Sequence, residues 1–304
     1  YLYIQSGITN QLVQKTIKGY NKTKDTLFVP DGNDLGSGEF TVTYTVLDSA
    51  GNVSVPSNPM TLYIDYTAPN NPGEPILNSP SDQGESNADR LTNQDRVDIT
   101  LTNILPGYSG LIYIDDGVTK TKIDSGFFTP GQEGITFDVP TAQTGTYTYT
   151  TVHIDTAGNR SGFSDPIIIS VDRDAPSAAL TYEGDALVRS GDISTLVTFT
   201  FTEPMDSVNV PTIDVLYPDP TGAARLSGVE LVESGNGDDI WTFSIPLDGD
   251  DYKTLNGNFI ITVTASDMAG NTISSEGITG LTTLRLDNTN PTYTNIVPAA
   301  SSYN

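Results

Sequence analysis

The sequence has no cysteine, a single histidine and a single tryptophan among its 304 residues. Without thiols the chain forms no disulfides, and its fold is indifferent to the redox state of its surroundings. A zinc site is not expected, because His153 is the only nitrogen or sulfur ligand of the usual kind. A catalytic nucleophile with a histidine base would have to depend on this same residue.

Positive charge is also scarce. The chain carries 14 Lys and Arg against 38 Asp and Glu, a formal net charge of −24. It should repel nucleic acid and anionic membrane surfaces, so neither is expected as a partner. No apolar run approaches the roughly 20 residues that span a bilayer, and no signal peptide is recognisable. Tyr1 is not a natural start, so we expect a segment of a longer protein.

Amphipathic helix patterns are missing as well, since no window repeats apolar residues at helical spacing. Apolar residues instead alternate with threonine, for example in residues 40–46 and 259–265. A period of two with threonine outside is typical of half-buried antiparallel strands. The low apolar content of 36% fits thin sandwich cores better than one large core.

One stretch recurs three times: an Asp-x-Ala-Gly-Asn turn, then a strand that ends in Asp a few residues before Pro. The turns are Asp48–Asn52, Asp155–Asn159 and Asp267–Asn271, and the strand-ending acids are Asp65, Asp172 and Asp287. The turn acids are 107 and 112 residues apart (155 − 48 and 267 − 155). A period of this length indicates one domain per repeat rather than one turn of a solenoid.

Further short strands are expected upstream of each recurring stretch. They are predicted at 97–102, 111–115, 120–123, 134–139, 147–154 and 167–171, and then at 179–182, 195–201, 212–216, 229–232, 241–245, 259–265 and 282–286. About seven short strands per ~100 residues indicate an immunoglobulin-like sandwich. The predicted fold is all-β: tandem immunoglobulin-like β-sandwich domains arranged as an elongated rod.

The repeats also predict domain boundaries. Residues 66–172 and 173–287 are expected to be complete domains, and residues 288–304 a linker and the start of a further one. Residues 1–65 are expected to be the C-terminal part of an incomplete domain, because Tyr1–Ile4 resembles Leu111–Ile114. An incomplete sandwich exposes a sheet edge. Its missing part is either outside this segment, which we favour, or supplied by another chain through strand complementation.

The recurring stretch resembles the bacterial Ig-like repeats of giant surface adhesins, of the repeats-in-toxin and biofilm-associated types. Asp65–Pro69 and Asp172–Pro176 match the linker of these repeats, whereas Asp287–Pro291 has Asn290 where alanine is usual. Phe201–Pro204 is similar to a second element of such repeats. The resemblance implies a surface extender whose domains bind Ca²⁺ at their junctions, which stiffens the rod.

Sandwich topology separates the two acids of each repeat, because alternate connections lie at opposite poles. Asp65 is therefore expected to face Asp155, and Asp172 to face Asp267. Further carboxylates should gather at the second junction. The predicted metal ligands are Asp48, Asp65, Asp155, Asp172, Asp174, Glu203, Asp206, Asp267 and Asp287.

Clustered carboxylates repel one another strongly in a partly dry site. Ca²⁺ takes six to eight oxygens in a loose geometry and suits a site drawn from several loops, whereas Mg²⁺ prefers its own waters. The alternative is that these aspartates only form turns, and we assign that role to Asn52, Asn159 and Asn271. The acidic groups at 115–117 and 248–251 are either second metal sites or solvated turns, and we favour solvated turns. Residues 31–34 lack the spacing of an EF-hand.

The acids recur by repeat position, which suits structure better than a single active site, so no enzyme is expected. His153 is expected to be a satisfied, partly buried side chain, and Trp241 a core residue. We predict an extracellular extender segment of a bacterial cell-surface adhesin, rigidified by Ca²⁺. Its partners would be neighbouring Ig-like domains of the same chain, and a host or biofilm surface reached through other domains. The alternatives are a pilus-like filament subunit or an accessory binding module of a secreted hydrolase.

Overall fold

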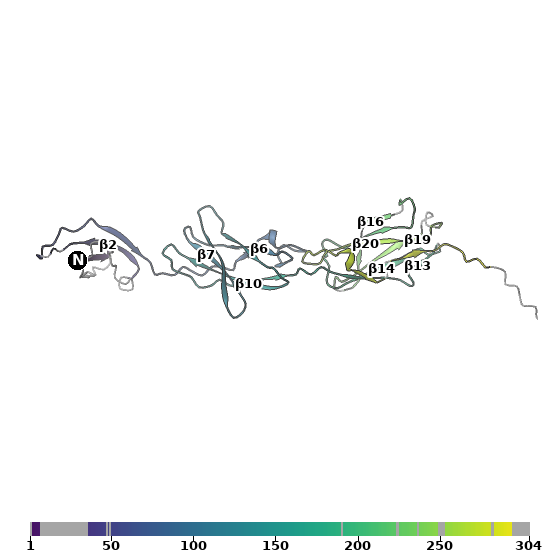
Figure 1. The fold of residues 1–304 in the computed structure, drawn as a ribbon, viewed down its shortest axis with the longest axis horizontal. Coiled ribbons are helices and arrows are strands. Elements are labelled where there is room, and N and C mark those ends of the chain that lie inside the picture. The colour runs from purple at the N-terminus through teal and green to yellow at the C-terminus, as the bar shows by residue number, and fades with distance from the viewer. Residues whose placement is uncertain are drawn as a thin grey trace, which may run out of the picture. The chain divides into compact units, whose positions relative to one another are not determined.

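The computed structural model describes residues 2–6, 36–46, 48, 50–189, 191–222, 225–235, 237–248, 253–280 and 283–293. Strands dominate this part of the chain (Figure 1). The helical segments described are two single 3₁₀ turns, Ser79–Ser81 and Ser275–Gly277. Within the described residues, no helix has the length and apolar character needed to cross a membrane.

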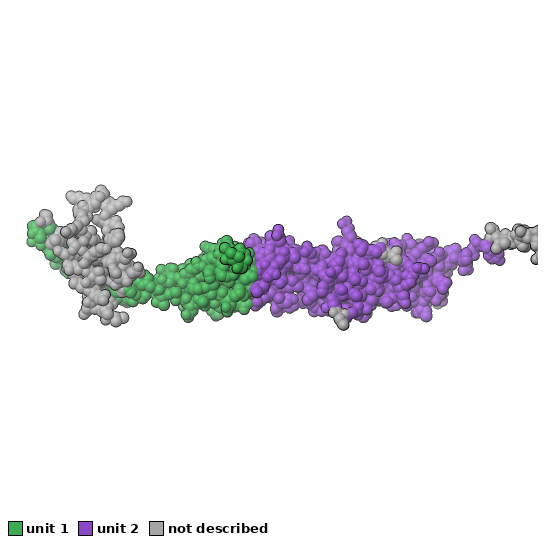
Figure 2. Space-filling view, turned by 90° about the horizontal axis from the view of Figure 1, so that it is seen from below, with its two compact units in different colours: residues 1–76, 99–137, 148–167 green, residues 77–98, 138–147, 168–304 purple. Residues whose placement is uncertain are grey.

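The chain divides into two compact units (Figure 2). The first comprises residues 1–76, 99–137 and 148–167, and the second residues 77–98, 138–147 and 168–304. Both units contain parts of the predicted domain 66–172, so this division follows packing density rather than the sequence repeat. The predicted domain boundaries remain a prediction.

The first sheet is antiparallel, in the order β1-β2-β3. Its strands are β1 (Leu2–Ser6), β2 (Gly38–Tyr44) and β3 (Met60–Ile64). Phe40 and Val42 are buried, as the alternation predicts. Tyr44 and Val46 belong to the same predicted row but are 49% and 59% exposed. The ladder from β2 to β3 ends at Val42↔Met60, and beyond it Tyr44 and Val46 bond the backbone of Ser57 and Ser54.

Eight strands follow between residues 76 and 171. They are β4 (Ile76–Leu77), β5 (Leu91–Thr92), β6 (Arg96–Leu101), β7 (Ser109–Asp115), β8 (Lys120–Phe127), β9 (Ile135–Pro140), β10 (Gly145–Ile154) and β11 (Ile167–Val171). One sheet has the order β4-β6-β9 and the other β5-β11-β10-β7-β8, with β5 parallel to β11. Two sheets with this strand division have the topology of an immunoglobulin-like sandwich.

Residues 178–286 repeat this arrangement. Their strands are β12 (Ala178–Tyr182), β13 (Leu187–Val188), β14 (Ser194–Phe201), β15 (Thr212–Leu216), β16 (Arg225–Glu230), β17 (Val232–Glu233), β18 (Ile240–Pro246), β19 (Gly257–Asn258), β20 (Ile260–Thr264), β21 (Ile278–Gly280) and β22 (Arg285–Leu286). The sheet orders are β17-β18-β14-β12-β21, β13-β22-β19 and β16-β15-β20. Only Phe259 separates β19 from β20. The order β13-β22-β19/β20-β15-β16 therefore matches β5-β11-β10-β7-β8 strand for strand.

The all-β fold predicted from the sequence is thus present. The alternation pattern missed the shortest strands, such as β5 and β13, because two residues are too few to show a period. It also predicted one strand at 229–232 where the structure has the ends of β16 and β17.

The core of the last repeat is centred on β14, whose inward positions alternate regularly. Val197 and Phe199 are fully buried, whereas Leu196 between the inward rows is 37% exposed. Trp241 faces Phe199 across the β14–β18 ladder and is 2% exposed, so it is a core residue as expected. Its indole N–H donates to the Asp238 carbonyl at 2.8 Å, which satisfies the one polar atom of the ring.

We expect Phe199→Ala to destabilise this core strongly, because it removes a buried ring and leaves a cavity. The free energy of unfolding should fall by about 3–5 kcal/mol. Leu196→Ala, on the same strand but partly exposed, should cost about 1 kcal/mol or less. Urea denaturation followed by circular dichroism measures both losses. Equal losses would mean that the assignment of the inward face is wrong.

Candidate metal centre

Each Asp-x-Ala-Gly-Asn turn is closed by its own aspartate. In the third turn Asp267 Oδ1 accepts the backbone N–H of Ala269 at 2.9 Å and of Asn271 at 2.8 Å, and Oδ2 accepts the Asn271 side-chain amide at 2.8 Å. The turns at Asp48 and Asp155 have the same three hydrogen bonds, at 2.8–2.9 Å. The glycine of each turn has φ of 92–93°, a conformation that other residues rarely adopt.

The strand-ending acids also share one local structure. Asp65, Asp172 and Asp287 each accept, through Oδ1, the backbone N–H of the residue two positions later, at 2.8–3.0 Å. This is the geometry by which aspartate starts a turn. Each linker therefore leaves its last strand in the same way, and the outer carboxylate oxygen of each acid is not used by that turn.

At two places a strand-ending acid contacts the Asp-x-Ala-Gly-Asn turn of the next repeat. We call the contact of Asp65 with turn 155–159 the first joint, and that of Asp172 with turn 267–271 the second joint. In the first, the Asn159 side-chain amide donates to the Asp65 carbonyl at 2.9 Å. In the second, the Asn271 amide donates to the Asp172 carbonyl at 3.0 Å.

The turn asparagines therefore do more than form turns, which corrects the role assigned to them from the sequence. One amide group donates to the turn aspartate and to the linker backbone, so it connects the two acids of a joint. Asparagine ends all three turns, and this recurrence was the signal in the sequence that could have revealed a role beyond the turn. In the remaining turn, which is the first in the sequence, the Asn52 side-chain amide also donates to its own turn acid, Asp48.

We expect Asn271→Ala to loosen the second joint, because it removes the hydrogen bond to the Asp172 carbonyl. A net loss of about 1–2 kcal/mol is the usual cost of such a bond, and the Asp174 amide should exchange faster with solvent. Asn209→Ala is the matched control, because within the described residues the Asn209 side-chain amide donates to Asp206 of its own loop and to no linker. Hydrogen exchange followed by NMR makes the comparison. Equal exchange at Asp174 in both variants would show that Asn271 does not hold the linker.

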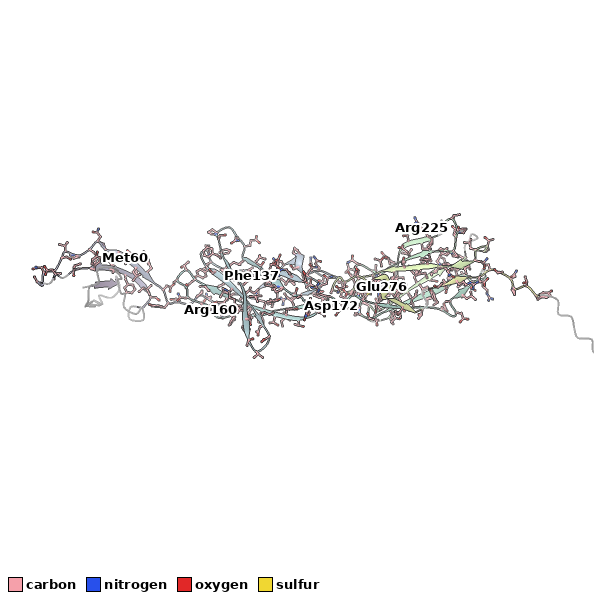
Figure 3. The ribbon with its side chains drawn as sticks, in the orientation of Figure 1. Met60, Phe137, Arg160, Asp172, Arg225 and Glu276 are labelled. Atoms are coloured by element: carbon pink, nitrogen blue, oxygen red, sulfur yellow. The ribbon has the colours of Figure 1, made fainter. Side chains whose placement is uncertain are left out.

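Three carboxylates meet at the second joint. The carboxylate oxygens of Asp172, Glu203 and Asp267 lie within 4.8 Å of one another. Asp267 is 1% exposed, and the other two are half-buried. Asp172, which is labelled in Figure 3, directly follows β11. Glu203 follows β14, and Asp267 follows β20. Among the residues that the structure describes, this is the one acidic group with spacing suited to a metal ion.

The cluster strongly perturbs Glu203. Burial, followed by the charges of Asp267, Asp172 and Asp174, raises the pKa of Glu203 from 4.5 to about 7. A carboxyl group with this pKa is partly protonated at neutral pH when no cation is present. Burial is the largest single cause of this raised pKa, and the charge repulsion expected at this junction adds to it.

The other carboxylates expected at the second joint differ in position. Asp174 is exposed and acts on Glu203 through its charge. Asp206 is 2% exposed, but its carboxylate closes its own loop. It accepts the backbone N–H groups of Val208 and Asn209 at 2.8 Å and the Asn209 side-chain amide at 2.7 Å. The structure thus places Asp206 beside the joint, engaged with its own loop.

The two remaining acids of the recurring stretch lie outside the joints. Asp48 is exposed, and hydrogen bonds from the Asn52 side chain and turn backbone lower its pKa. Asp287 is half-buried and accepts a bond from the Arg285 guanidinium at 3.4 Å. Neither belongs to an acidic group of three among the described residues.

The first joint is less acidic than the second. Asp155 is buried, and Asp65 is exposed. Burial acts to raise the pKa of Asp155, but hydrogen bonds from Asn159 and the turn backbone together lower it. β6 corresponds to β14 in the repeat that precedes it. Glu203 lies two residues after β14, whereas Asn103 lies two residues after β6. The first joint therefore lacks the third carboxylate at this position.

His153 is 5% exposed, which is more buried than expected. Its ring hydrogen-bonds the backbone of Asn70, but Nε2 has no partner among the described residues. The expected hydrogen-bonded side chain is therefore found for one of the two ring nitrogens, within the described residues. Burial lowers the pKa of His153, which keeps the ring neutral.

The stabilisation that Glu203 contributes to the metal-free protein should be lost as the pH rises from 4.5 to about 7. The folded-state pKa of Glu203 is raised, so the folded state holds this proton more tightly than the unfolded chain. The stabilisation is complete below the unfolded pKa and is lost as the pH passes the folded one. In EDTA, Glu203→Gln should flatten this part of the pH profile, and Glu230→Gln on the exposed edge of β16 should not. Superimposable profiles of wild type and Glu203→Gln would contradict the assignment.

No family model matches the sequence. A search of curated proteins likewise finds no match. Among solved structures, a Ca²⁺-stabilized adhesin that helps an Antarctic bacterium bind ice is similar at 19% identity and a TM-score of 0.39, covering 82% of this chain and 57% of that one. A tetra-tandem repeat from the extending region of a large adhesion protein is similar at 17% and 0.29, covering 84% and 58%. The chicken CNTN1 FN1–FN3 domains are similar at 14% and 0.31, covering 78% and 75%.

The chain thus spans 57% and 58% of the lengths of the two adhesin structures. At these identities and TM-scores, the similarities assign no activity.

Proposed function

We propose that this chain is an extender segment of a bacterial cell-surface adhesin whose joints are stiffened by Ca²⁺. The observation that carries the proposal is the acidic cluster of Asp172, Glu203 and Asp267, with the raised pKa of Glu203. Two adhesins are among the structures similar to this chain, which agrees with the proposal.

The oxygens of the cluster fit a calcium ion. Ca²⁺–oxygen distances of about 2.3–2.6 Å place two ligands on opposite sides of the ion about 5 Å apart. The mutual spacing of the three carboxylates, within 4.8 Å, is of this size.

The carboxylates also have free acceptor capacity. A carboxylate offers about four lone-pair sites, and the turn uses three of those on Asp267. Asp267 can therefore give one ligand oxygen without breaking its turn. Within the described residues, the Asp172 carboxylate accepts one hydrogen bond, from the backbone N–H of Asp174 to Oδ1, so its other oxygen can bind an ion. Water and backbone carbonyls would supply the remaining oxygens that Ca²⁺ requires.

Other common ions fit less well. Zn²⁺ favours cysteine and histidine, and the chain has no cysteine and one histidine. Mg²⁺ demands near-octahedral geometry and retains its waters, whereas three loops that converge on one point offer an irregular set of oxygens. Ca²⁺ is therefore the cation that this set of ligands favours.

A bound ion would act on the chain by joining three segments. Asp172 belongs to the linker, Glu203 to the loop after β14, and Asp267 to the recurring turn. An ion shared by all three would fix the linker against the repeat that follows it. We infer a rod of joined repeats, placed outside the cell, in which the direct partners of this segment are neighbouring repeats. Adhesion to a host or biofilm surface would belong to other domains of the whole protein.

The proposed role is structural rather than catalytic. The same three turn bonds and the same linker geometry occur at each repeat position, whereas an active site needs one distinct constellation. The third carboxylate at the second joint adds charge to this repeated framework and can be understood as a ligand. It does not need a role as a general acid or base.

Ca²⁺ should raise the melting temperature of the protein, and EDTA should reverse the rise. Glu203→Gln should weaken calcium binding at the second joint by about tenfold or more, since affinity depends on the number of charged ligands. This substitution leaves every turn bond in place. Glu230→Gln is the control and should bind as wild type does. Isothermal titration calorimetry measures the affinity, and differential scanning calorimetry the melting temperature.

Calcium affinity should rise with pH up to about 7, because the ion displaces the proton of Glu203. A protein whose melting temperature and heat signal do not respond to Ca²⁺ would contradict the proposal. Equal binding by wild type and Glu203→Gln would instead mean that the ion lies elsewhere.

A further inference from the structure

A second contact holds the turn of the second joint, and it involves no acid of the cluster. The loop Asp82–Arg90, between the 3₁₀ turn Ser79–Ser81 and β5, reaches the recurring turn 267–271. The backbone N–H of Glu85 donates to the Met268 carbonyl at 3.0 Å. The Ser207 hydroxyl donates to the Glu85 carboxylate. The loop thus contacts both the turn and the segment that follows Asp206.

Gly84 makes the close approach possible. Its φ is +115°, and a Cβ at this position would overlap the Met268 carbonyl oxygen and lie 2.9 Å from the Ala269 carbonyl carbon. On the other side, a Cβ on Gly270 would lie 3.5 Å from the Gly84 Cα. The loop and the turn therefore meet through their backbones, and Gly84 is the position that has no space for a side chain.

The loop is held in shape from its own side. Asp82 is 3% exposed, and its Oδ2 accepts the Arg90 N–H at 3.2 Å, which closes the loop between its two ends. The preceding Ser81 accepts the Asp98 N–H at 2.9 Å, and the Gln94 amide donates to the Gln83 side chain at 2.9 Å. These bonds fix the loop independently of the turn that it contacts, so little order has to be gained on contact.

The turn thus has two occupied sides. Its aspartate, Asp267, belongs to the acidic cluster, and its Met268 carbonyl accepts a hydrogen bond from the loop. We propose that the loop Asp82–Arg90 is a cation-independent latch that keeps the turn of the second joint in place when the acidic cluster holds no ion. Its partner is the backbone of turn 267–271 together with Ser207. The proposal rests on these contacts alone and does not require that the cluster binds Ca²⁺.

The other turns show no such partner within the described residues. A Cβ on Gly51 or on Gly158, the glycines that correspond to Gly270, would have nothing within 4 Å. An open pocket borders the turn of the first joint at Thr156 and Ala157, where the second joint has the latch. The latch is therefore a property of one joint and not of the recurring motif.

Hydrogen exchange in EDTA tests the latch through the Glu85 amide. In wild type this amide should stay protected without any divalent cation. Gly84→Ala should make this amide exchange at least about tenfold faster, because the added Cβ would break the contact that protects it from solvent. Gly131→Ala is the matched control: it has a similar positive φ of +96°, and its Cβ would have nothing within 4 Å. It should leave the Glu85 amide as in wild type.

A second variant covers the case in which Gly84→Ala unfolds its own loop. Ser207→Ala removes the hydroxyl bond to Glu85 without altering either backbone, and it should speed exchange at Glu85 by a smaller factor. If EDTA alone removes the protection in wild type, or if Gly84→Ala and Gly131→Ala exchange equally, the latch is overturned. A protein that binds no Ca²⁺ but keeps a protected Glu85 amide would contradict the proposed function and leave the latch standing.

Discussion

The three hydrogen bonds accepted by each turn aspartate are the constraint on which the joints depend. Two come from backbone N–H groups and one from the asparagine that ends the turn. They fix the backbone of the turn, and they also orient the asparagine amide toward the linker carbonyl. Because the turn satisfies its aspartate internally, its shape does not require an ion. A cation at the second joint would therefore act on a framework that is already arranged.

Charge is the second constraint, and it acts only where acids meet. Asp267 is almost fully buried, and its turn donors compensate part of its charge. Asp172 and Glu203 then add like charge within 4.8 Å. A proton on Glu203 relieves this repulsion at low pH, and a divalent cation would relieve it at neutral pH. Proton and cation are thus alternative ways to neutralise one site, which links the stability of the joint to both.

The sequence predicted the fold and which segments meet, and it missed how single side chains and close backbone contacts are used. Alternation in residues 259–265 and the fixed spacing of the turns were sufficient for the all-β fold. The pairing of linker with turn followed from the opposite poles of a sandwich. The sequence could not show that Asp206 closes its own loop while Asp267 reaches the cluster, because aspartate followed by asparagine forms turns in both places. The bridging role of Asn271 depends on how closely the linker approaches, which no local pattern encodes. The contact made by Gly84 depends in the same way on a distant backbone.

The difference between the two joints follows from residues outside the motif. Both joints have the same turn, the same linker acid and the same asparagine bridge. Only the second has Glu203, where the first has Asn103, and only its turn has a described backbone partner at Gly84. The recurring motif therefore determines which segments contact each other, whereas the stability of each joint depends on single residues in neighbouring loops. In a chain of such repeats, the stability of each joint can differ through charge or backbone contact while the motif that aligns the linker with the turn stays the same.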